Sequence, residues 1–117
     1  MPNLEQKRAA YAWSCVQNCN SDYVNLAKSA PALVMGNGLM QTLAFFQSKG
    51  KDHHNSLNRH IFSRLKNRFP DMCKGEDFKT VTRFLYDSGS IKYRRATEET
   101  LELLRWIRQF AAAVESE

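Results

Sequence analysis

The sequence has few cysteines, and their number is odd. Cys15, Cys19 and Cys73 are the three present. Any disulfide scheme leaves one of them unpaired, which argues against a secreted scaffold held together by disulfides. We therefore expect reduced thiols.

The sequence also lacks long apolar runs. No stretch approaches the roughly 18 apolar residues of a membrane-spanning helix, and residues 1–19 have no apolar centre of the kind that signal peptides carry. We therefore expect a cytoplasmic protein that has no membrane partner.

Strand-like patterns are missing as well. No segment alternates apolar and polar residues for long, whereas apolar residues recur at the helical period from end to end. A chain of 117 residues suits one hydrophobic core. The sequence predicts an all-α protein, a compact single-domain bundle of about five to six helices over residues 1–117.

Caps and breakers suggest where the first helices begin and end. Asn3 can cap a first helix, with Gln6 reaching back, and Asn20 or Ser21 can cap a second. The second helix should stop before Pro31, which suits the first turn of the next helix. Gly36 and Gly38 then predict a kink, a break or a closely packed neighbour before the helix resumes at 39–48.

The second half of the chain is divided in the same way. Residues 51–56 are polar and suggest a loop, Pro70 ends the helix that follows, and residues 75–77 begin another. Residues 87–90 form a turn by composition. Thr97 can cap the last helix, although a start at Ser90 is an alternative that the sequence leaves open.

Apolar stripes at helical spacing identify the expected core. The final helix carries two stripes, so it should be buried over more than half its circumference. The stripes comprise Leu39, Leu43 and Phe46; Leu57, Ile61, Leu65 and Phe69; Phe78, Val81, Thr82 and Leu85; Leu104, Ile107, Ala111 and Val114; and Leu103, Trp106 and Phe110.

The positive charge is concentrated in the middle of the chain. Of the net charge of +5, residues 1–48 contribute +1, residues 49–95 contribute +7 and residues 96–117 contribute −3. Aromatic residues are interleaved with these cations, and Tyr93 lies among Lys92, Arg94 and Arg95. This distribution favours an anionic partner, RNA or DNA, that is bound through phosphates.

Catalytic and metal-binding patterns are weak. His53, His54 and His60 with Cys15 and Cys19 could in principle bind zinc or support RNA cleavage, but their spacing matches no usual zinc motif. Gly36 and Gly38 lack the Gly-Lys-Ser/Thr ending of a phosphate loop, and no nucleophile elbow is present. We therefore expect no enzymatic activity, no cofactor and no metal.

The run APALVMGNGLMQTLAFFQSK, residues 30–49, is the most specific feature of the sequence. It resembles the proline-containing helix, the Gly-Leu-x-x-Thr-Leu-Ala-Phe core and the terminal Ser-Lys of the small helical subunit of the Cmr complex, the type III-B CRISPR effector. The final helix, with Leu104, Trp106, Ile107, Phe110 and Ala111, is similar to that family too.

The resemblance implies a non-catalytic subunit present in several copies along an RNA-guided ribonucleoprotein. Its partners would be other Cmr subunits, especially the repeated backbone subunit, further copies of itself, and CRISPR RNA and target RNA. We expect the phosphate contacts to come from Lys49, Lys51, Arg59, Arg64, Lys66, Arg94 and Arg95. The alternatives are the small subunit of the related type III-A (Csm) complex, a freestanding helical DNA-binding regulator and a metal-dependent ribonuclease.

Overall fold

The computed structural model describes residues 1–116, which form six α-helices and no strand. This confirms the predicted all-α class and the expected number of helices. The radius of gyration, 13.4 Å, is about that of a compact domain of this length. The helices are α1 (Leu4–Cys15), α2 (Ser21–Asn37), α3 (Leu39–Lys49), α4 (Asp52–Arg68), α5 (Phe78–Asp87) and α6 (Ser90–Ser116).

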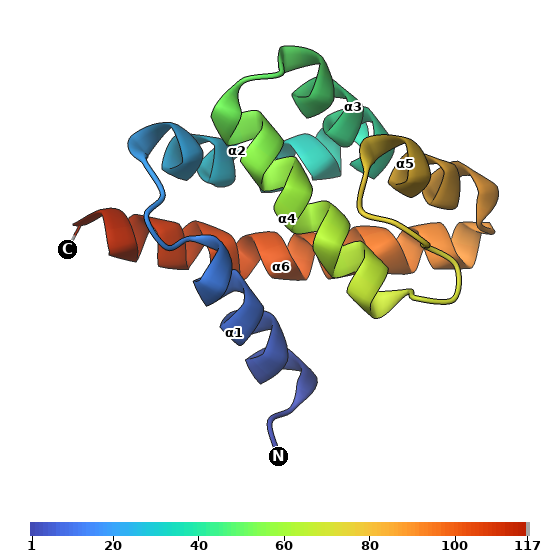
Figure 1. Ribbon diagram of the computed structural model, residues 1–117, viewed down its shortest axis with the longest axis horizontal. Coiled ribbons are helices and arrows are strands. Elements are labelled where there is room, and N and C mark those ends of the chain that lie inside the picture. The colour runs from blue at the N-terminus through green and yellow to red at the C-terminus, as the bar shows by residue number, and fades with distance from the viewer. Residues whose placement is uncertain (117) are drawn as a thin grey trace.

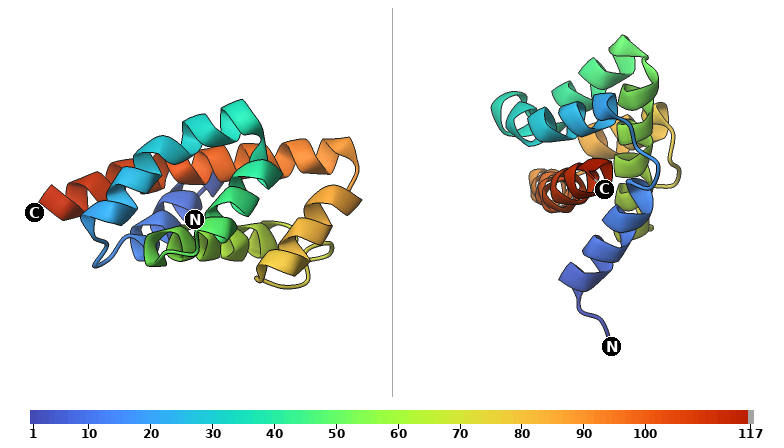
Figure 2. Two further views of the ribbon diagram at one scale, coloured as in Figure 1. Left: turned by 90° about the horizontal axis from the view of Figure 1, so that it is seen from above. Right: turned by 90° about the vertical axis from the view of Figure 1, so that its left-hand side faces the viewer.

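Helix α6 is the longest and runs across the whole molecule (Figure 1). Helix α2 lies along α6 in the opposite direction, and α1 also packs against α6 (Figure 2). Helix α4 crosses α6, with α3 near its start and α5 near its end (Figure 1). One face of α4 therefore lies against the core while the opposite face remains on the surface.

A single hydrophobic cluster fills the space between the helices. The expected stripes supply most of it, since Leu39, Leu43 and Phe46 of α3 are buried together with the inward faces of α4, α5 and α6. Within the last helix Leu103, Leu104, Ile107 and Ala111 are fully covered. The predicted core positions are thus largely confirmed. Among residues 1–116 no helix is both long enough and apolar enough to cross a membrane.

Several predicted helix ends are also confirmed. Asn3 and Gln6 form the expected capping box at α1, and Asn20 and Asp77 cap α2 and α5 by accepting from backbone N–H groups. Gly50 ends α3 in the left-handed conformation that glycine adopts at little cost. These ends depend on contacts within three or four residues.

The prediction that a helix ends before Pro31 is wrong, because Pro31 lies inside α2. Proline removes one backbone hydrogen bond and crowds the preceding turn, at a cost of about 3 kcal/mol. Apolar side chains of α2 on both sides of the proline are buried, among them Leu26, Ala27 and Val34. Packing against α6 stabilises the continuous helix more than the proline weakens it.

Gly38 makes the predicted break between α2 and α3. Its φ of +88° and ψ of 160° lie in a region that only glycine adopts readily. The N-terminus of α3 has no side-chain cap of its own, and the Tyr93 hydroxyl accepts a hydrogen bond from Met40 N–H at 3.2 Å instead. Tyr93, although it lies among three cations in the sequence, therefore supports the start of α3. Gly36, by contrast, faces open space, so no neighbour requires glycine there.

Two further boundaries differ from the prediction. Residues 52–56 are the first turns of α4 rather than a loop, because His54 packs against the Phe46 ring at 5.6 Å between centroids and draws this segment onto the core. The last helix begins at Ser90, as the alternative expected. Thr97 is internal to α6, and its hydroxyl donates to the Tyr93 carbonyl.

Candidate nucleic-acid interface

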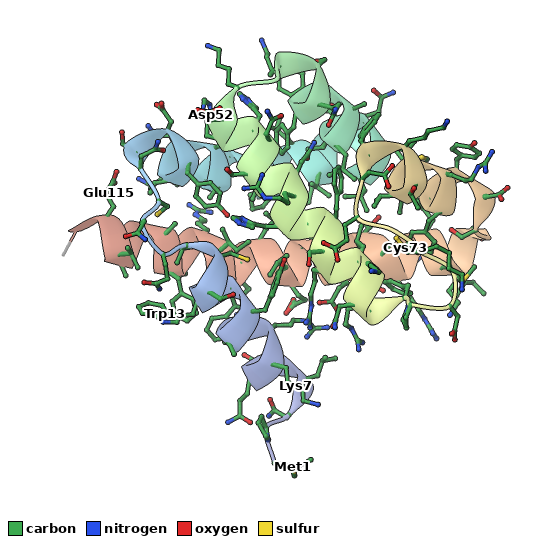
Figure 3. All side chains as sticks on the ribbon, viewed as in Figure 1. Met1, Lys7, Trp13, Asp52, Cys73 and Glu115 are labelled. Atoms are coloured by element: carbon green, nitrogen blue, oxygen red, sulfur yellow. The ribbon has the colours of Figure 1, made fainter. Side chains whose placement is uncertain are left out.

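The exposed edge of α4 carries a line of cations. Lys51 immediately precedes the helix, and Arg59 and Lys66 follow on the side that faces away from Leu57, Ile61 and Leu65. Arg59 and Lys66 are seven residues apart, so they lie about 10 Å apart along the axis. In Figure 3 the label Asp52 marks the start of α4, and Cys73 lies in the loop that follows its end. The basic edge, as we call Lys51, Arg59 and Lys66, is open to a partner.

Acidic groups do little to neutralise the basic edge. Lys66 has a carboxylate nearby, that of Glu76 at 3.8 Å, and both side chains are 46% exposed. Pairs this exposed contribute at most about 1 kcal/mol and are screened by salt. Phosphates could therefore displace this pair at small cost.

Lys49 and Lys51 lie together where α3 gives way to α4. The Lys49 ammonium is 5.3 Å from the centroid of the exposed Phe45 ring. Burial lowers the pKa of His54, and the neighbouring His53, Lys49 and Lys51 lower it further. This group extends the basic edge at its N-terminal end.

The prediction that Arg64 contacts phosphate is wrong, because its side chain is only 7% exposed. Its Nε donates to Glu99 Oε2 at 3.0 Å, and the guanidinium lies 5.8 Å from the centroid of the Tyr11 ring. A hint was present in the sequence, since Arg64 is at helical spacing from Leu57 and Ile61. Arg64 belongs to the interior.

Glu99 is the centre of a buried cluster that joins α1, α4 and α6. Arg8 donates from Nε to Oε2 and from Nη2 to Oε1, each at 2.9 Å, and Arg68 Nε donates to Oε1 at 3.1 Å. Burial alone would raise the pKa of Glu99. The hydrogen bonds and charges of Arg8 and Arg64 outweigh burial and hold the pKa below its usual value.

Arg94 and Arg95 are exposed, but they lie on α6, whereas the basic edge belongs to α4. Arg95 lines a cavity of about 380 Å³ beside Arg68 and Lys92, but Glu98 and Glu102 line the same cavity. The positive side chains that line this cavity are therefore nearly matched in number by carboxylates. The structure thus brings Arg95 to the C-terminal end of α4 without creating a strongly positive surface.

Two of the three histidines and two of the cysteines lie around one cavity. Cys15, Cys19, His53 and His60 line one cavity of about 240 Å³. His60 Nδ1 shares a hydrogen bond of 2.7 Å with the Tyr23 hydroxyl, and burial lowers the pKa of His60 to about 4. Within residues 1–116 no group of three or more histidine, cysteine or acidic side chains is arranged to bind a metal ion.

A second basic feature was missed from the sequence. Lys74, Lys79 and Arg83 surround a cavity of about 560 Å³ between α5 and the loop that precedes it. The spacing of Lys79 and Arg83, four residues apart on a helix, was a usable signal. The contribution of Lys74 was not predictable, because it depends on how the loop folds back over α5.

Comparisons with known proteins agree with this architecture. Residues 4–114 match the family described as CRISPR-associated protein (Cas_Cmr5). The CRISPR system Cmr subunit Cmr5 of Thermus thermophilus is 30% identical over 93 residues, which cover 80% of this chain and 75% of that protein. The crystal structure of a CRISPR-associated Cmr5 family protein from Thermus thermophilus superposes with a TM-score of 0.79 and 27% identity, over 97% of this chain and 98% of the other.

The family match extends over nearly the whole length of the helical bundle, and the related crystal structure has the same fold along its whole chain. The resemblance seen in residues 30–49 and in the last helix is thereby confirmed. This chain belongs to the Cmr5 family of CRISPR-associated proteins.

Proposed function

We propose that the protein is the non-catalytic small subunit of a type III-B CRISPR (Cmr) effector ribonucleoprotein and contacts guide and target RNA. The family supports the assignment to Cmr rather than to the related Csm complex. The proposal places the protein in the cytoplasm, in keeping with its three free cysteines.

The observation that carries the RNA contact is the basic edge of α4. Lys51, Arg59 and Lys66 are exposed along one side of a helix whose other side is anchored in the core. Such an array contacts phosphates without reading bases, so it tolerates any guide sequence. Lys49 extends it at one end, and Arg94 and Arg95 provide further cations on α6. Arg64 is no longer part of the proposed surface.

The surroundings of the histidines support a role without catalysis. His60 is tied to Tyr23 and its lowered pKa leaves it neutral at physiological pH, while His54 is buried against Phe46. A general acid or base needs access to substrate and a pKa near the working pH. Neither of these residues offers both.

Exposed apolar side chains support contacts with proteins. Trp13, Met35, Phe45 and Ile91 are all large and exposed. Aromatic residues and methionine are enriched where proteins meet. We propose that the backbone subunit and further copies of this chain cover such side chains, so that the copies stack along the complex with the basic edge facing RNA.

A charge-reversal experiment tests the proposal. The variant with Lys51→Glu, Arg59→Glu and Lys66→Glu is compared with a control carrying the same charge change at Lys7, Lys28 and Arg108, which are exposed on other helices. The affinity of each full chain for single-stranded RNA is measured over a range of salt concentrations.

We expect the α4 variant to bind RNA far more weakly. The salt slope, meaning the slope of log affinity against log salt concentration, should become shallower by roughly 2, since each of the three lost phosphate contacts on a single strand accounts for about 0.7. Equal losses in both variants would refute the proposed surface. Mass spectrometry of the material that copurifies with the native protein should find guide RNA and other Cmr subunits. A lone protein that prefers duplex DNA would instead indicate a DNA-binding regulator.

A further inference from the structure

We propose that the cavity beside α5 holds one unpaired ribonucleotide of the bound RNA. This inference rests on the proposed function and extends it, because it assigns base and sugar contacts to residues outside the basic edge. The α5 pocket, as we call this cavity, has a volume of about 560 Å³. Cavities of roughly 300–1,000 Å³ commonly accommodate small organic ligands.

The chemistry of the α5 pocket matches a nucleotide. Met72, which is 43% exposed, supplies apolar surface that a base can contact, whereas Phe84 is 4% exposed and forms part of the pocket floor. Lys74, Lys79 and Arg83 supply three cations. No carboxylate of residues 1–116 forms an ion pair within 4.0 Å of those cations. A hydrogen bond to Tyr86 and the charge of Asp87, which lines the same pocket, raise the pKa of Arg83, so one carboxylate partly balances the three cations.

Helix geometry arranges these groups in two rows. Lys79, Arg83 and Asp87 follow one another at intervals of four residues, and Thr80, Phe84 and Ser88 form the adjacent row. Cations and apolar surface therefore lie side by side along α5. The Asp87 carboxylate lines the same pocket and can accept a hydrogen bond from a ribose 2′-hydroxyl or a base N–H.

The loop that completes the pocket is held in place. Cys73 is fully buried, its N–H donates to the Phe69 carbonyl at 2.8 Å, and its Sγ donates to the Gly75 carbonyl at 3.4 Å. Anchoring Cys73 leaves its neighbours Met72 and Lys74 on the surface, where both are exposed. The pocket is thus formed before any ligand binds.

The α5 pocket also continues the basic edge. Lys66 of the basic edge pairs with Glu76, which lies in the loop that also supplies Met72 and Lys74 to the pocket. A strand whose phosphates follow Arg59 and Lys66 would next meet Lys74 and Arg83. An acidic peptide would use the cations but would leave the apolar surface and Asp87 without partners, so an RNA nucleotide fits better.

Binding of a labelled single-stranded RNA by the full chain, followed by fluorescence anisotropy, tests this inference. We expect Lys79→Gln with Arg83→Gln to weaken binding about tenfold and to lower the salt slope by roughly 1.4. Met72→Ala should weaken binding about fivefold without changing the salt slope, because the variant loses apolar contact area and no charge. Lys7→Gln with Lys28→Gln is the matched control. All of these positions are exposed, and thermal melting confirms that each variant is folded.

Crosslinking gives an independent readout. RNA carrying 4-thiouridine should crosslink to residues 72–88, and the crosslinks should disappear in the Lys79 and Arg83 variant. Crosslinks confined to α4, or a Met72→Ala variant with full affinity, would overturn the pocket while leaving the basic edge intact. Equal binding of DNA of the same sequence, or displacement of the RNA by polyglutamate, would also overturn it. If the wild-type chain itself failed to bind single-stranded RNA, the proposed function would be refuted instead.

Discussion

Replacing Glu99 with glutamine removes the charge that holds three arginines together, and we expect this single change to destabilise the fold strongly. Glu99 and Arg64 are only 4% and 7% exposed, whereas Arg68 is 37% exposed. Removing one partner of a buried ion pair typically costs about 3–5 kcal/mol, because the other charge remains buried and uncompensated.

The expected cost lies near the lower end of that range. Glutamine retains one carbonyl oxygen that can still accept from an arginine, and Arg68 can turn toward water. We therefore expect about 3 kcal/mol, a large part of the roughly 5–15 kcal/mol that domains usually have. With about 4 °C lost per kcal/mol at this size, the melting temperature should fall by roughly 12 °C.

Urea unfolding monitored by circular dichroism measures the loss in the free energy of unfolding, provided that the dependence of this free energy on urea concentration is the same in both proteins. Glu98→Gln is the matched control, since Glu98 is an exposed neighbour on the same helix, and it should change stability by less than about 0.5 kcal/mol. Double-mutant cycles should show stronger coupling of Glu99 to Arg64 than to the exposed Arg68. A cost below about 1 kcal/mol, or equal coupling to both arginines, would refute this reasoning.

Three further predictions concern His60, Tyr93 and Gly38. The pKa of His60 falls from 6.5 to about 4 on folding, so the unfolded chain binds the proton more readily and the folded state should lose stability as pH falls from 6.5 toward 4. In thermal melts recorded over this pH range, His60→Gln should reduce the dependence of the melting temperature on pH. Tyr93→Phe removes the acceptor of Met40 N–H and should cost about 1 kcal/mol in urea unfolding; no loss would show that water replaces the hydroxyl. Gly38→Ala should cost about 1–3 kcal/mol by the same measurement because φ is +88°, whereas Gly36→Ala, which meets no neighbour, should be neutral or stabilising.

Some features of the site could be recognised from the sequence and others could not. Arg59 and Lys66 lie opposite an apolar stripe, so their exposure followed from helical spacing alone. Arg64 was misassigned because its burial depends on Glu99, which is 35 residues away in the chain and belongs to another helix. The α5 pocket was missed because Met72 and Lys74 reach it only through a loop anchored by Cys73.

The sequence by itself determined the all-α class, the positions of most caps and the inward faces of the helices, because these follow from interactions within about four residues. It also identified the family through residues 30–49. Only the tertiary structure decided that α2 continues through Pro31, that residues 52–56 join α4 and that Arg64 turns inward to Glu99. Each of these depends on burial by a distant element, and the free energy of that burial exceeds the local preference that a sequence pattern reports.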